Sequence, residues 1–486
     1  MEKLKGLYPE PVFRCFEELC GIPHASYHIN EISDYLKSFA ERRGFSCVQD
    51  AEKNILIRMP AMAGYESEET LILQGHMDMV AVHEDASVDP CAFAPKVTHD
   101  GEWVYAEGSS LGGDDGIAVA MMMALMEDPS CPHPALELLI TTNEEVGMDG
   151  AVGFDAALLQ GKRLLNLDSE DEGIFTAGCA GGVRVVAKLP LEEAKDGLCG
   201  SLYRIAFSGG LGGHSGQMIH KGRGNANRLL GRVLHKLVGE CGAVLEEVAG
   251  GTACNAIPQE AAMKVVIPAG KKNEAEKLLG ELRADIAHEY HGRDDALTLS
   301  WNEVEKEYKA SFSKESSGKA AGLLIAEPDG VQAMSGVVDG LVETSLNLGI
   351  LKLEEGELKA YYELRSMIGS AAEHLKERVA AIAGAFGAEA EISASYPEWE
   401  YRESSPLREK MVKVFERMYG HAPKTEVIHA GLECGVLAKK IPGFDAVSIG
   451  PDMQDIHTTK ERLNIASVGR VWDFVLQVLG EKDCNE

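Results

Sequence analysis

The tripeptide His76-Met77-Asp78 comes directly after the apolar run 71–73, and polar, mostly acidic residues follow later apolar runs in the same way. The later members are Asn143-Glu144-Glu145 after 136–140, Asn166-Leu167-Asp168 after 164–165, and His457 in the loop that follows 446–449. Short apolar runs with polar flanks are typical of buried strands in a largely parallel sheet. Because open α/β sheets bind ligands just beyond the carboxyl ends of their strands, these side chains are expected to converge on one crevice. A mixture of His, Asp and Glu is what a zinc site requires.

The motif Gly112-Gly113-Asp114-Asp115-Gly116 precedes a predicted helix, 117–127. Its carboxylates could simply cap that helix. Alternatively, one of them could bridge two metal ions about 3.5 to 4 Å apart, which is the usual separation in two-metal hydrolytic sites.

His76 and Asp78 are two residues apart, so both side chains can lie on one side of a strand end. A ligand histidine whose second ring nitrogen donates to Asp78 would have a fixed tautomer. In Glu144-Glu145, one carboxylate could bind metal while its neighbour takes a proton from water. Each signal has a plain alternative: an exposed His-x-Asp by chance, a charged surface pair, and a turn residue at Asp168.

Composition restricts the function classes. A chain of 486 residues is expected to form two or three domains, and its net charge of −30 argues against a nucleic-acid partner. The longest apolar stretch, 117–126, is too short to span a membrane, and no signal peptide is visible. Eleven cysteines without a Cys-x-x-Cys pair favour reduced thiols in the cytoplasm.

The pattern of elements predicts an α/β fold, in which a doubly wound, mostly parallel sheet forms a catalytic domain with an inserted α+β lid domain. Helices and buried strands alternate through 1–182, the first part of the catalytic domain. Half-polar strands such as 202–207 and 358–364, with charged helices between them, mark 183–395 as the lid. The helix 406–419 and the strand 446–449 return to the first style, so 396–486 is predicted to complete the catalytic domain.

Together, these motifs resemble the co-catalytic zinc peptidases that include carboxypeptidase G2-like enzymes, tripeptidases and carnosinases, and more narrowly the aminoacyl-histidine (Xaa-His, cytosolic non-specific) dipeptidase branch. The resemblance runs nearly end to end and includes Gly212-Gly213-His214-Ser215-Gly216, Asn255-Ala256-Ile257-Pro258, Arg365-Ser366 and His429-Ala430-Gly431-Leu432-Glu433-Cys434-Gly435. Gly116 stands where tripeptidases usually carry Lys, which favours the Xaa-His branch.

The resemblance implies two divalent metal ions per chain, zinc in the first place, with cobalt or manganese as alternatives. One metal would be held by His76, Asp114 and Asp168, and the other by Asp114, Glu145 and His457. Asp78 would orient His76, and Glu144 would act as general base and then acid. The resemblance also implies a cis peptide bond after Asp114.

The lid would supply substrate-binding residues. By the same resemblance, His214 stabilises the oxyanion, Asn255 adds a polar contact and Arg365 binds the substrate carboxylate, a task that suits the guanidinium fork. A flexible glycine-rich loop and a strand-surface cation are the plain alternatives for His214 and Arg365. His429 and Glu433 match the pattern without an assigned role.

These observations predict a cytoplasmic metallopeptidase whose partner is a small peptide substrate, with no nucleic acid and no membrane. Its substrates would be dipeptides with a free carboxylate, carnosine-like Xaa-His peptides among them. A tripeptidase or an N-acyl amino acid deacylase with the same metals, and a catalytically silent metal-binding protein, are the alternatives; a homodimer is left open. Two strand-rich halves around 314–330 suggest that the lid mimics a lid dimer of smaller relatives, so that His214 would act in its own chain.

Overall fold

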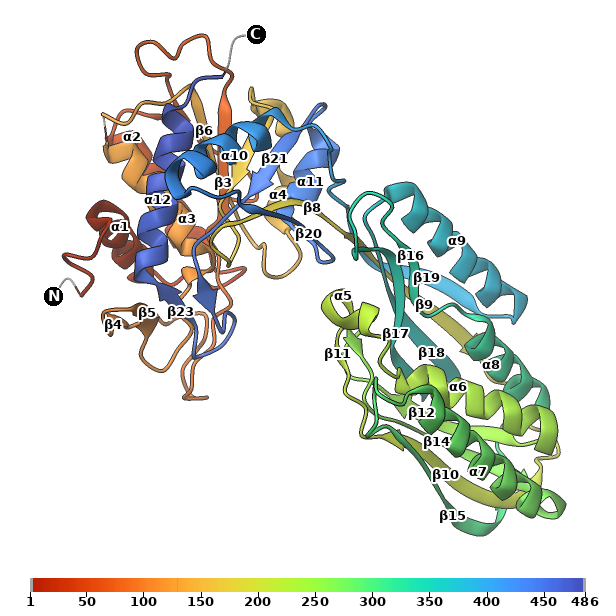
Figure 1. Cartoon of the computed structure of the whole chain (residues 1–486). Helices are drawn as coiled ribbons and strands as arrows, with labels where there is room; N and C mark the ends of the chain where they lie inside the picture. Colours follow the sequence, from red (N-terminus) through yellow and green to blue (C-terminus); the bar gives the residue numbers. More distant parts are fainter. Residues whose placement is uncertain (1–2, 129, 484–486) are drawn as a thin grey trace. The chain divides into compact units, whose positions relative to one another are not determined.

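The computed structural model describes residues 3–128 and 130–483 (Figure 1). The chain forms two compact units. The first comprises Met1–Cys179, Tyr401–Ile428 and Leu432–Glu486, and the second comprises Ala180–Glu400 and His429–Gly431. The short segment His429–Gly431 therefore belongs with the second unit, although the sequence pattern placed it with the first. No helix in the described parts is both long and apolar enough to cross a membrane.

The first unit is built on an eight-stranded sheet with the order β1-β2-β6-β3-β7-β21-β8-β20. Its strands are β1 (Ser46–Gln49), β2 (Ile55–Met59), β3 (Leu71–His76), β6 (Leu136–Thr141), β7 (Arg163–Asn166), β8 (Ile174–Cys179), β20 (Lys424–Ile428) and β21 (Asp445–Ser448). A small second sheet contains β4 (Val97–His99), β5 (Trp103–Ala106), β22 (Met453–Gln454) and β23 (Arg462–Asn464). The helices are α1 (Glu10–Cys20), α2 (Asn30–Arg42), α3 (Gly113–Glu127), α4 (Asp149–Gly153), α10 (Pro406–Tyr419), α11 (Glu433–Lys440) and α12 (Ile465–Gly480).

The four central strands of this sheet, β6, β3, β7 and β21, are parallel. Their register is continuous, because Gln74 of β3 lies opposite Leu139 and Asn166, and Asn166 lies opposite Ser448. The carboxyl ends of these strands therefore meet along one edge, where ligand sites of open α/β sheets are built.

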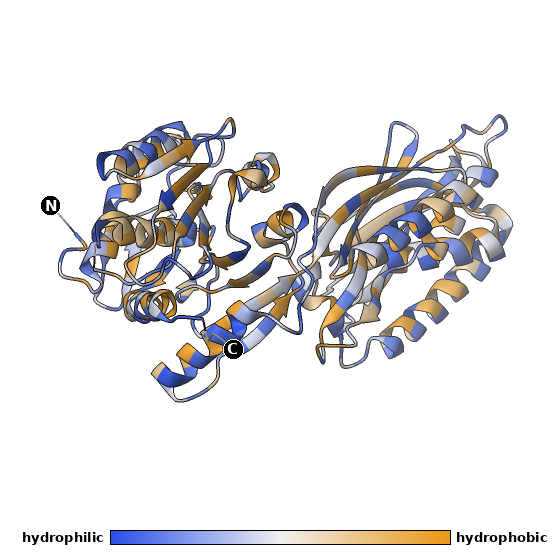
Figure 2. Ribbon diagram, turned by 90° about the horizontal axis from the view of Figure 1, so that it is seen from above, coloured by the Kyte–Doolittle hydropathy of each residue, from blue (hydrophilic) through white to orange (hydrophobic). Residues whose placement is uncertain are grey.

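Both faces of the sheet are buried. Leu71 and Leu73 of β3 join the large core cluster with α1, α3 and α12, while Ile72 between them is also fully buried and points to the opposite face. Helix α3 is apolar on all sides because it packs against both β3 and α1. Figure 2 shows apolar residues recurring along many of the chain's strands and helices. The predicted α/β fold with a parallel-containing sheet is confirmed.

Two differences from the predicted elements bear on the site. Strand β3 continues beyond the apolar run to His76, so Gln74 and Gly75 are buried strand residues. Helix α3 begins at Gly113, but Asp114 and Asp115 have non-helical torsions, so the regular helix starts where the sequence predicted it.

The second unit is an α+β structure around a nine-stranded sheet, in the order β15-β10-β14-β12-β17-β18-β9-β19 with β16 paired to β17. Its strands are β9 (Gly181–Pro190), β10 (Cys199–Ser208), β12 (Val244–Gly250), β14 (Ala261–Pro268), β15 (Thr298–Lys309), β16 (Gly330–Met334), β17 (Val342–Glu354), β18 (Glu357–Ser366) and β19 (Glu389–Tyr396), and a separate pair is β11 (Gly213–His214) with β13 (Ala256–Ile257). The helices are α5 (Ser215–Met218), α6 (Ala226–Lys236), α7 (Lys272–Glu289), α8 (Lys314–Ala326) and α9 (Gly369–Ala385). Figure 1 shows α6 to α9 along this sheet.

The two strand-rich halves expected from the sequence are joined into one sheet. The junction between β12 and β17 consists of two residue pairs, Ala249 with Lys352 and Gly250 with Leu351. Four strands lie on the β12 side of this junction, and five, counting β16, lie on the β17 side.

Candidate metal centre

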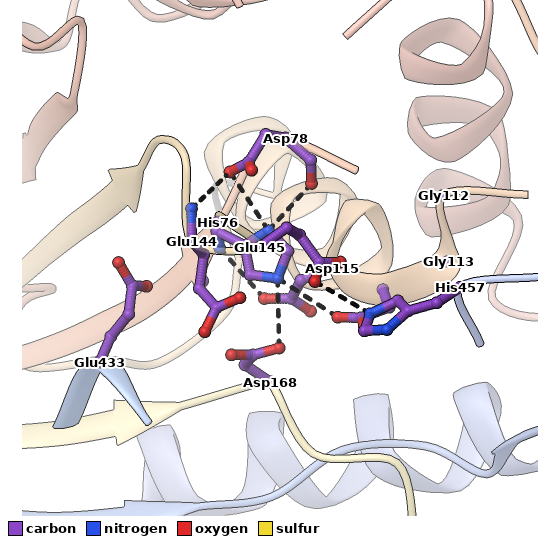
Figure 3. A network of polar contacts seen from close by, with 12 residues as sticks. His76, Asp78, Gly112, Gly113, Asp115, Glu144, Glu145, Asp168, Glu433 and His457 are labelled. Atoms are coloured by element: carbon purple, nitrogen blue, oxygen red, sulfur yellow. Dashed lines mark hydrogen bonds and ion pairs between the residues drawn. The ribbon is translucent and has the colours of Figure 1, made fainter. Parts of the chain in front are cut away.

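Asp114 lies between two histidines of the first unit. Its Oδ1 is 3.2 Å from His76 Nε2, and its Oδ2 is 3.1 Å from His457 Nε2. Asp168 Oδ1 lies 3.5 Å from the same His76 nitrogen, and Glu145 Oε2 lies 2.9 Å from the same His457 nitrogen. The site therefore consists of two half-sites that share one carboxylate (Figure 3).

The strand ends position most of these side chains. His76 is the last residue of β3, Glu144 and Glu145 follow β6, and Asp168 follows β7. His457 comes from the loop after β22, and Asp114 from the start of α3. The structure thus brings together the five side chains that the resemblance implied as ligands. The two predicted catalytic residues, Asp78 and Glu144, lie beside them (Figure 3).

Asp115 is a second candidate ligand, because it also lies within ligand distance of His76 and Asp168. Asp115 is fully buried, and its Oδ2 accepts the backbone N–H of His76 at 3.2 Å. Asp114 is the better candidate, since both of its oxygens face histidine ring nitrogens, whereas one oxygen of Asp115 accepts a backbone N–H. The Asp114–Asp115 peptide bond is cis, as the resemblance implied.

Asp78 holds His76 in a different way from the sequence expectation. His76 Nδ1 lies 2.9 Å from the backbone carbonyl oxygen of Asp78 and 3.6 Å from its carboxylate Oδ1. The ring N–H therefore donates to the carbonyl, which leaves Nε2 as the ligand atom. The Asp78 carboxylate accepts hydrogen bonds from Ser26 Oγ at 2.8 Å and from the backbone N–H of Glu144 at 3.1 Å. Asp78 thus fixes the loop that carries Glu144.

The electrostatics show how strongly this cluster attracts positive charge. Burial opposes protonation of His76, but Asp168, Asp114 and Asp78 outweigh it and raise the pKa of His76 well above its usual value. Hydrogen bonds to Asp114 and Glu145 raise the pKa of His457 to about 10. Burial raises the pKa of Asp168 to about 7 and raises the pKa of Glu144 well above its usual range.

The donor set fits divalent cations. Within the described ranges, the ion pairs of the cluster's carboxylates are formed with His76 and His457 and with no Lys or Arg. Imidazole nitrogens and carboxylate oxygens are the ligands that Zn²⁺ takes in catalytic sites. Metal binding displaces protons from such ligands. The raised pKa values of His76 and His457 show that, without metal, these two side chains hold the protons that a metal ion would displace.

Glu461 is a residue of this site that the sequence did not single out. Its carboxylate is almost fully buried and accepts four backbone N–H groups, those of Leu111, Gly112, Gly113 and Asp114, at 2.7 to 3.3 Å. Glu461 lies four residues after His457, so it ties the loop of one ligand to the loop of another. An acidic residue in a predicted loop gives no signal of such a role, because most are solvated.

Gly75 is needed for close packing behind the site. A Cβ at this position would lie 2.4 Å from Asp115 Oδ2 and 2.9 Å from Ala118 Cβ. Gly75→Ala is therefore expected to displace Asp115 and His76, to destabilise the fold by about 1 to 3 kcal/mol, and to weaken Zn²⁺ binding by about 10-fold or more. Chelator competition measures the Zn²⁺ affinity, and thermal unfolding measures the loss of stability.

Gly480→Ala is the matched control, because a Cβ there meets its nearest atom at 3.9 Å in the same unit. Unchanged Zn²⁺ affinity in Gly75→Ala would show that the contact to Asp115 does not shape the centre.

The second unit gathers the predicted substrate-binding residues. His214 of β11 pairs with Ala256 of β13, and the N–H of Ser215 donates to the carbonyl of Asn255 at 2.7 Å, which places Asn255 beside the histidine loop. Arg365 on β18 donates to the Tyr396 hydroxyl at 2.8 Å and to the backbone carbonyl of His429 at 3.4 Å. Burial and the charge of Arg365 lower the pKa of His214.

His429 is part of the same group, a contact that the sequence left without a role. Its Nε2 lies 2.8 Å from Ser345 Oγ, and burial, Arg365 and His214 lower its pKa to about 3. His429 is therefore a neutral imidazole at pH 7. Its Nδ1, and Nε of Arg365, are buried without a hydrogen-bond partner in the described structure.

Residues 72–481 match the sequence profile of peptidase family M20/M25/M40, so the chain belongs to this family. The resemblance inferred from the motifs is thereby confirmed. The chain is 36% identical over 482 residues to the cytosol non-specific dipeptidase of Escherichia coli (strain K12), with 99% of each chain covered. It also matches the crystal structure of aminoacylhistidine dipeptidase from Vibrio alginolyticus, with 34% identity, a TM-score of 0.91, and 98% and 97% of the two chains covered. The aminopeptidase PepT of Bacillus cereus shares the fold at 16% identity, with a TM-score of 0.56 and 98% of each chain covered.

Proposed function

We propose that this peptidase is a two-metal dipeptidase that hydrolyses dipeptides with a free C-terminal carboxylate, Xaa-His peptides among them. The observation that carries the proposal is the position of Asp114, whose two oxygens face two different histidines. His76, Asp114 and Asp168 would hold one divalent ion, and Asp114, Glu145 and His457 the other. The names of the similar proteins, a cytosol non-specific dipeptidase and an aminoacylhistidine dipeptidase, support the substrate class and a cytoplasmic location.

Bound at this centre, two divalent ions would supply Lewis-acid chemistry, polarising the scissile carbonyl and lowering the pKa of the attacking water. Glu144 accepts the proton of that water and delivers it to the leaving amine. Its raised pKa suits both steps, because burial favours the protonated carboxyl after transfer. Asp78 keeps Glu144 in place through the Glu144 backbone N–H and keeps the His76 ring oriented through its own carbonyl.

The preference for a free carboxylate rests on Arg365 and its neighbours. A guanidinium can donate two parallel N–H groups to a carboxylate. Arg365 is held in place by Tyr396 and the His429 carbonyl, so little side-chain freedom would be lost on binding. His214 would donate to the oxyanion of the tetrahedral intermediate, and Asn255 would add a polar contact to the substrate.

Metal removal and reconstitution test the proposal. Protein stripped with a chelator and reloaded with Zn²⁺, Mn²⁺ or Co²⁺ is assayed on carnosine, an α-linked Xaa-His dipeptide, the amide of that dipeptide, a tripeptide and an acetylated amino acid. We expect hydrolysis of the two free dipeptides only after reloading. The amide should react about 10- to 100-fold more slowly, since hydrogen bonds to a charged carboxylate contribute about 1.5 to 3 kcal/mol.

Three outcomes would contradict this assignment. Failure to hydrolyse any dipeptide with any of the metals would refute the dipeptidase. A faster reaction with the tripeptide or the acetylated amino acid would favour the tripeptidase or the deacylase. Equal rates for the dipeptide and its amide would refute recognition of the carboxylate.

A further inference from the structure

A row of polar side chains crosses the first unit's sheet just behind the metal centre. It consists of Gln74, Thr141, Asn166 and Ser448, and all four side chains are fully buried. They lie at or near the carboxyl ends of β3, β6, β7 and β21, whose other residues are mostly apolar. By strand alternation they share the face opposite the core cluster formed with α1, α3 and α12.

Glu433, the first residue of α11, reaches this row with its carboxylate. Its Oε2 accepts hydrogen bonds from Gln74 Nε2 and from Thr141 Oγ1, each at 2.6 Å. Glu433 is completely buried, and its Oε1 has no hydrogen-bond partner among the described residues. Beyond the effect of burial, the charge of Glu433 raises the pKa of Glu144, so the two side chains interact electrostatically.

The hydrogen bonds continue from Gln74 across the sheet. Gln74 Oε1 accepts from Asn166 Nδ2 at 2.7 Å, and Asn166 Oδ1 accepts from the hydroxyl of Ser448 and from the backbone N–H of Asp168 at 3.3 Å. The chain of contacts that starts at Glu433 thus ends on the backbone of a proposed metal ligand. It also passes through Gln74, two residues before His76 on the same strand.

Three of the four strands in this row end at, or are followed by, a residue of the proposed site. His76 ends β3, Glu144 and Glu145 follow β6, and Asp168 follows β7. Burying a carboxylate costs free energy unless it is well hydrogen-bonded, yet Glu433 has only two such bonds. A buried network of this kind fixes the relative positions of its members.

From these contacts we propose that Glu433 is a positioning residue of the metal centre, which holds the carboxyl ends of β3 and β6 in register through Gln74 and Thr141. The inference rests on the proposed metal centre and adds to it a residue that contacts neither substrate nor metal. Its effect reaches Asp168 through Asn166 and reaches His76 along β3.

The test compares Glu433→Ala with Glu433→Gln. Alanine removes the acceptor for both donors, so Zn²⁺ affinity, measured by chelator competition on the full chain, should fall by about 10-fold or more, the range seen for residues behind metal ligands. Glutamine keeps one acceptor oxygen, so its Zn²⁺ affinity and kcat should lose clearly less than the roughly 10-fold expected for alanine. Thr141→Val removes one donor at nearly constant shape and should weaken Zn²⁺ binding to an intermediate degree.

Glu137 provides the matched control, because it is a buried glutamate at the opposite end of β6. Its carboxylate accepts the backbone N–H groups of Gln160 and Gly161 at 2.9 to 3.1 Å. Glu137→Ala should lower the melting temperature as Glu433→Ala does, but should leave Zn²⁺ affinity unchanged.

Equal Zn²⁺ affinities in Glu433→Ala and the parent chain would overturn the inference, as would equal losses in Glu433→Ala and Glu137→Ala. If Glu433→Ala does not fold, Thr141→Val decides, since unchanged Zn²⁺ affinity in that variant overturns it too. The metal content of the parent chain distinguishes failure of this inference from failure of the proposed function. A parent chain that binds no metal refutes the metal centre itself, whereas two bound metals with no effect of Glu433 refute only the positioning role.

Discussion

Asp114→Ala is expected to bind neither metal ion and to lose at least about 10³-fold in kcat/KM, because the Lewis-acid contribution of bound metals amounts to several kcal/mol. The reason is geometric. Asp114 is the carboxylate whose Oδ1 faces His76 and whose Oδ2 faces His457, so its removal opens both half-sites at once. Elemental analysis after gel filtration measures the loss of metal per chain. Initial rates on an Xaa-His dipeptide measure the loss of kcat/KM.

Asp114→Asn refines this test, since an amide offers one oxygen acceptor and should support at most one of the two half-sites. Asp445→Asn serves as control. Asp445 is a buried acid on β21 that accepts from Ser405 and from the backbone of Leu407, away from the proposed ligands. Two metals retained by Asp114→Ala would show that Asp114 does not bridge the centre.

Glu144→Gln should lose about 10² to 10⁴-fold in kcat, the usual contribution of a general base. It should keep two metals per chain, because in the structure Glu145 rather than Glu144 faces His457. Glutamine preserves the shape and the backbone hydrogen bond to Asp78, which uses the N–H of residue 144. Steady-state kinetics on a dipeptide together with metal analysis give the result.

Glu137→Gln, on the strand that leads to Glu144, controls for the general loss of a buried glutamate and should keep nearly full activity. A Glu144→Gln chain that loses a metal ion would assign Glu144 as a ligand. A Glu144→Gln chain that keeps the kcat of the parent would exclude Glu144 from proton transfer.

The convergence of several of these side chains could be predicted from the sequence because of a property of parallel sheets. His76, Glu145 and Asp168 each follow a short apolar run, and parallel strands bring their carboxyl ends to one edge whatever their separation along the chain. Asp114 and His457 needed the family motifs, since neither follows the end of a parallel strand directly. The prediction that His214 acts in its own chain stays a prediction.

The supporting residues could not be predicted in the same way. Glu461 and Glu433 accept hydrogen bonds from donors more than 290 positions away in sequence, and nothing local distinguishes them from solvated acids. Gln74 offered a signal, because a polar residue inside an apolar strand must find a buried partner. The orientation of His76 by a carbonyl, where a carboxylate was expected, depends on ångström-scale backbone geometry that residue types do not encode.

The position of β21 in the sheet has a consequence for how this chain is synthesised. Strand β21 lies between β7 and β8, although it follows them by more than 260 residues. A nascent chain leaving the ribosome therefore has the whole of Ala180–Glu400, almost all of the second unit, available before the first unit can close its sheet. The amino-terminal segment must wait with the edges of β7 and β8 unpaired, and unpaired edges of this kind promote aggregation during vectorial folding. His457 emerges later still, so the proposed metal centre cannot be complete until residue 457 has been made.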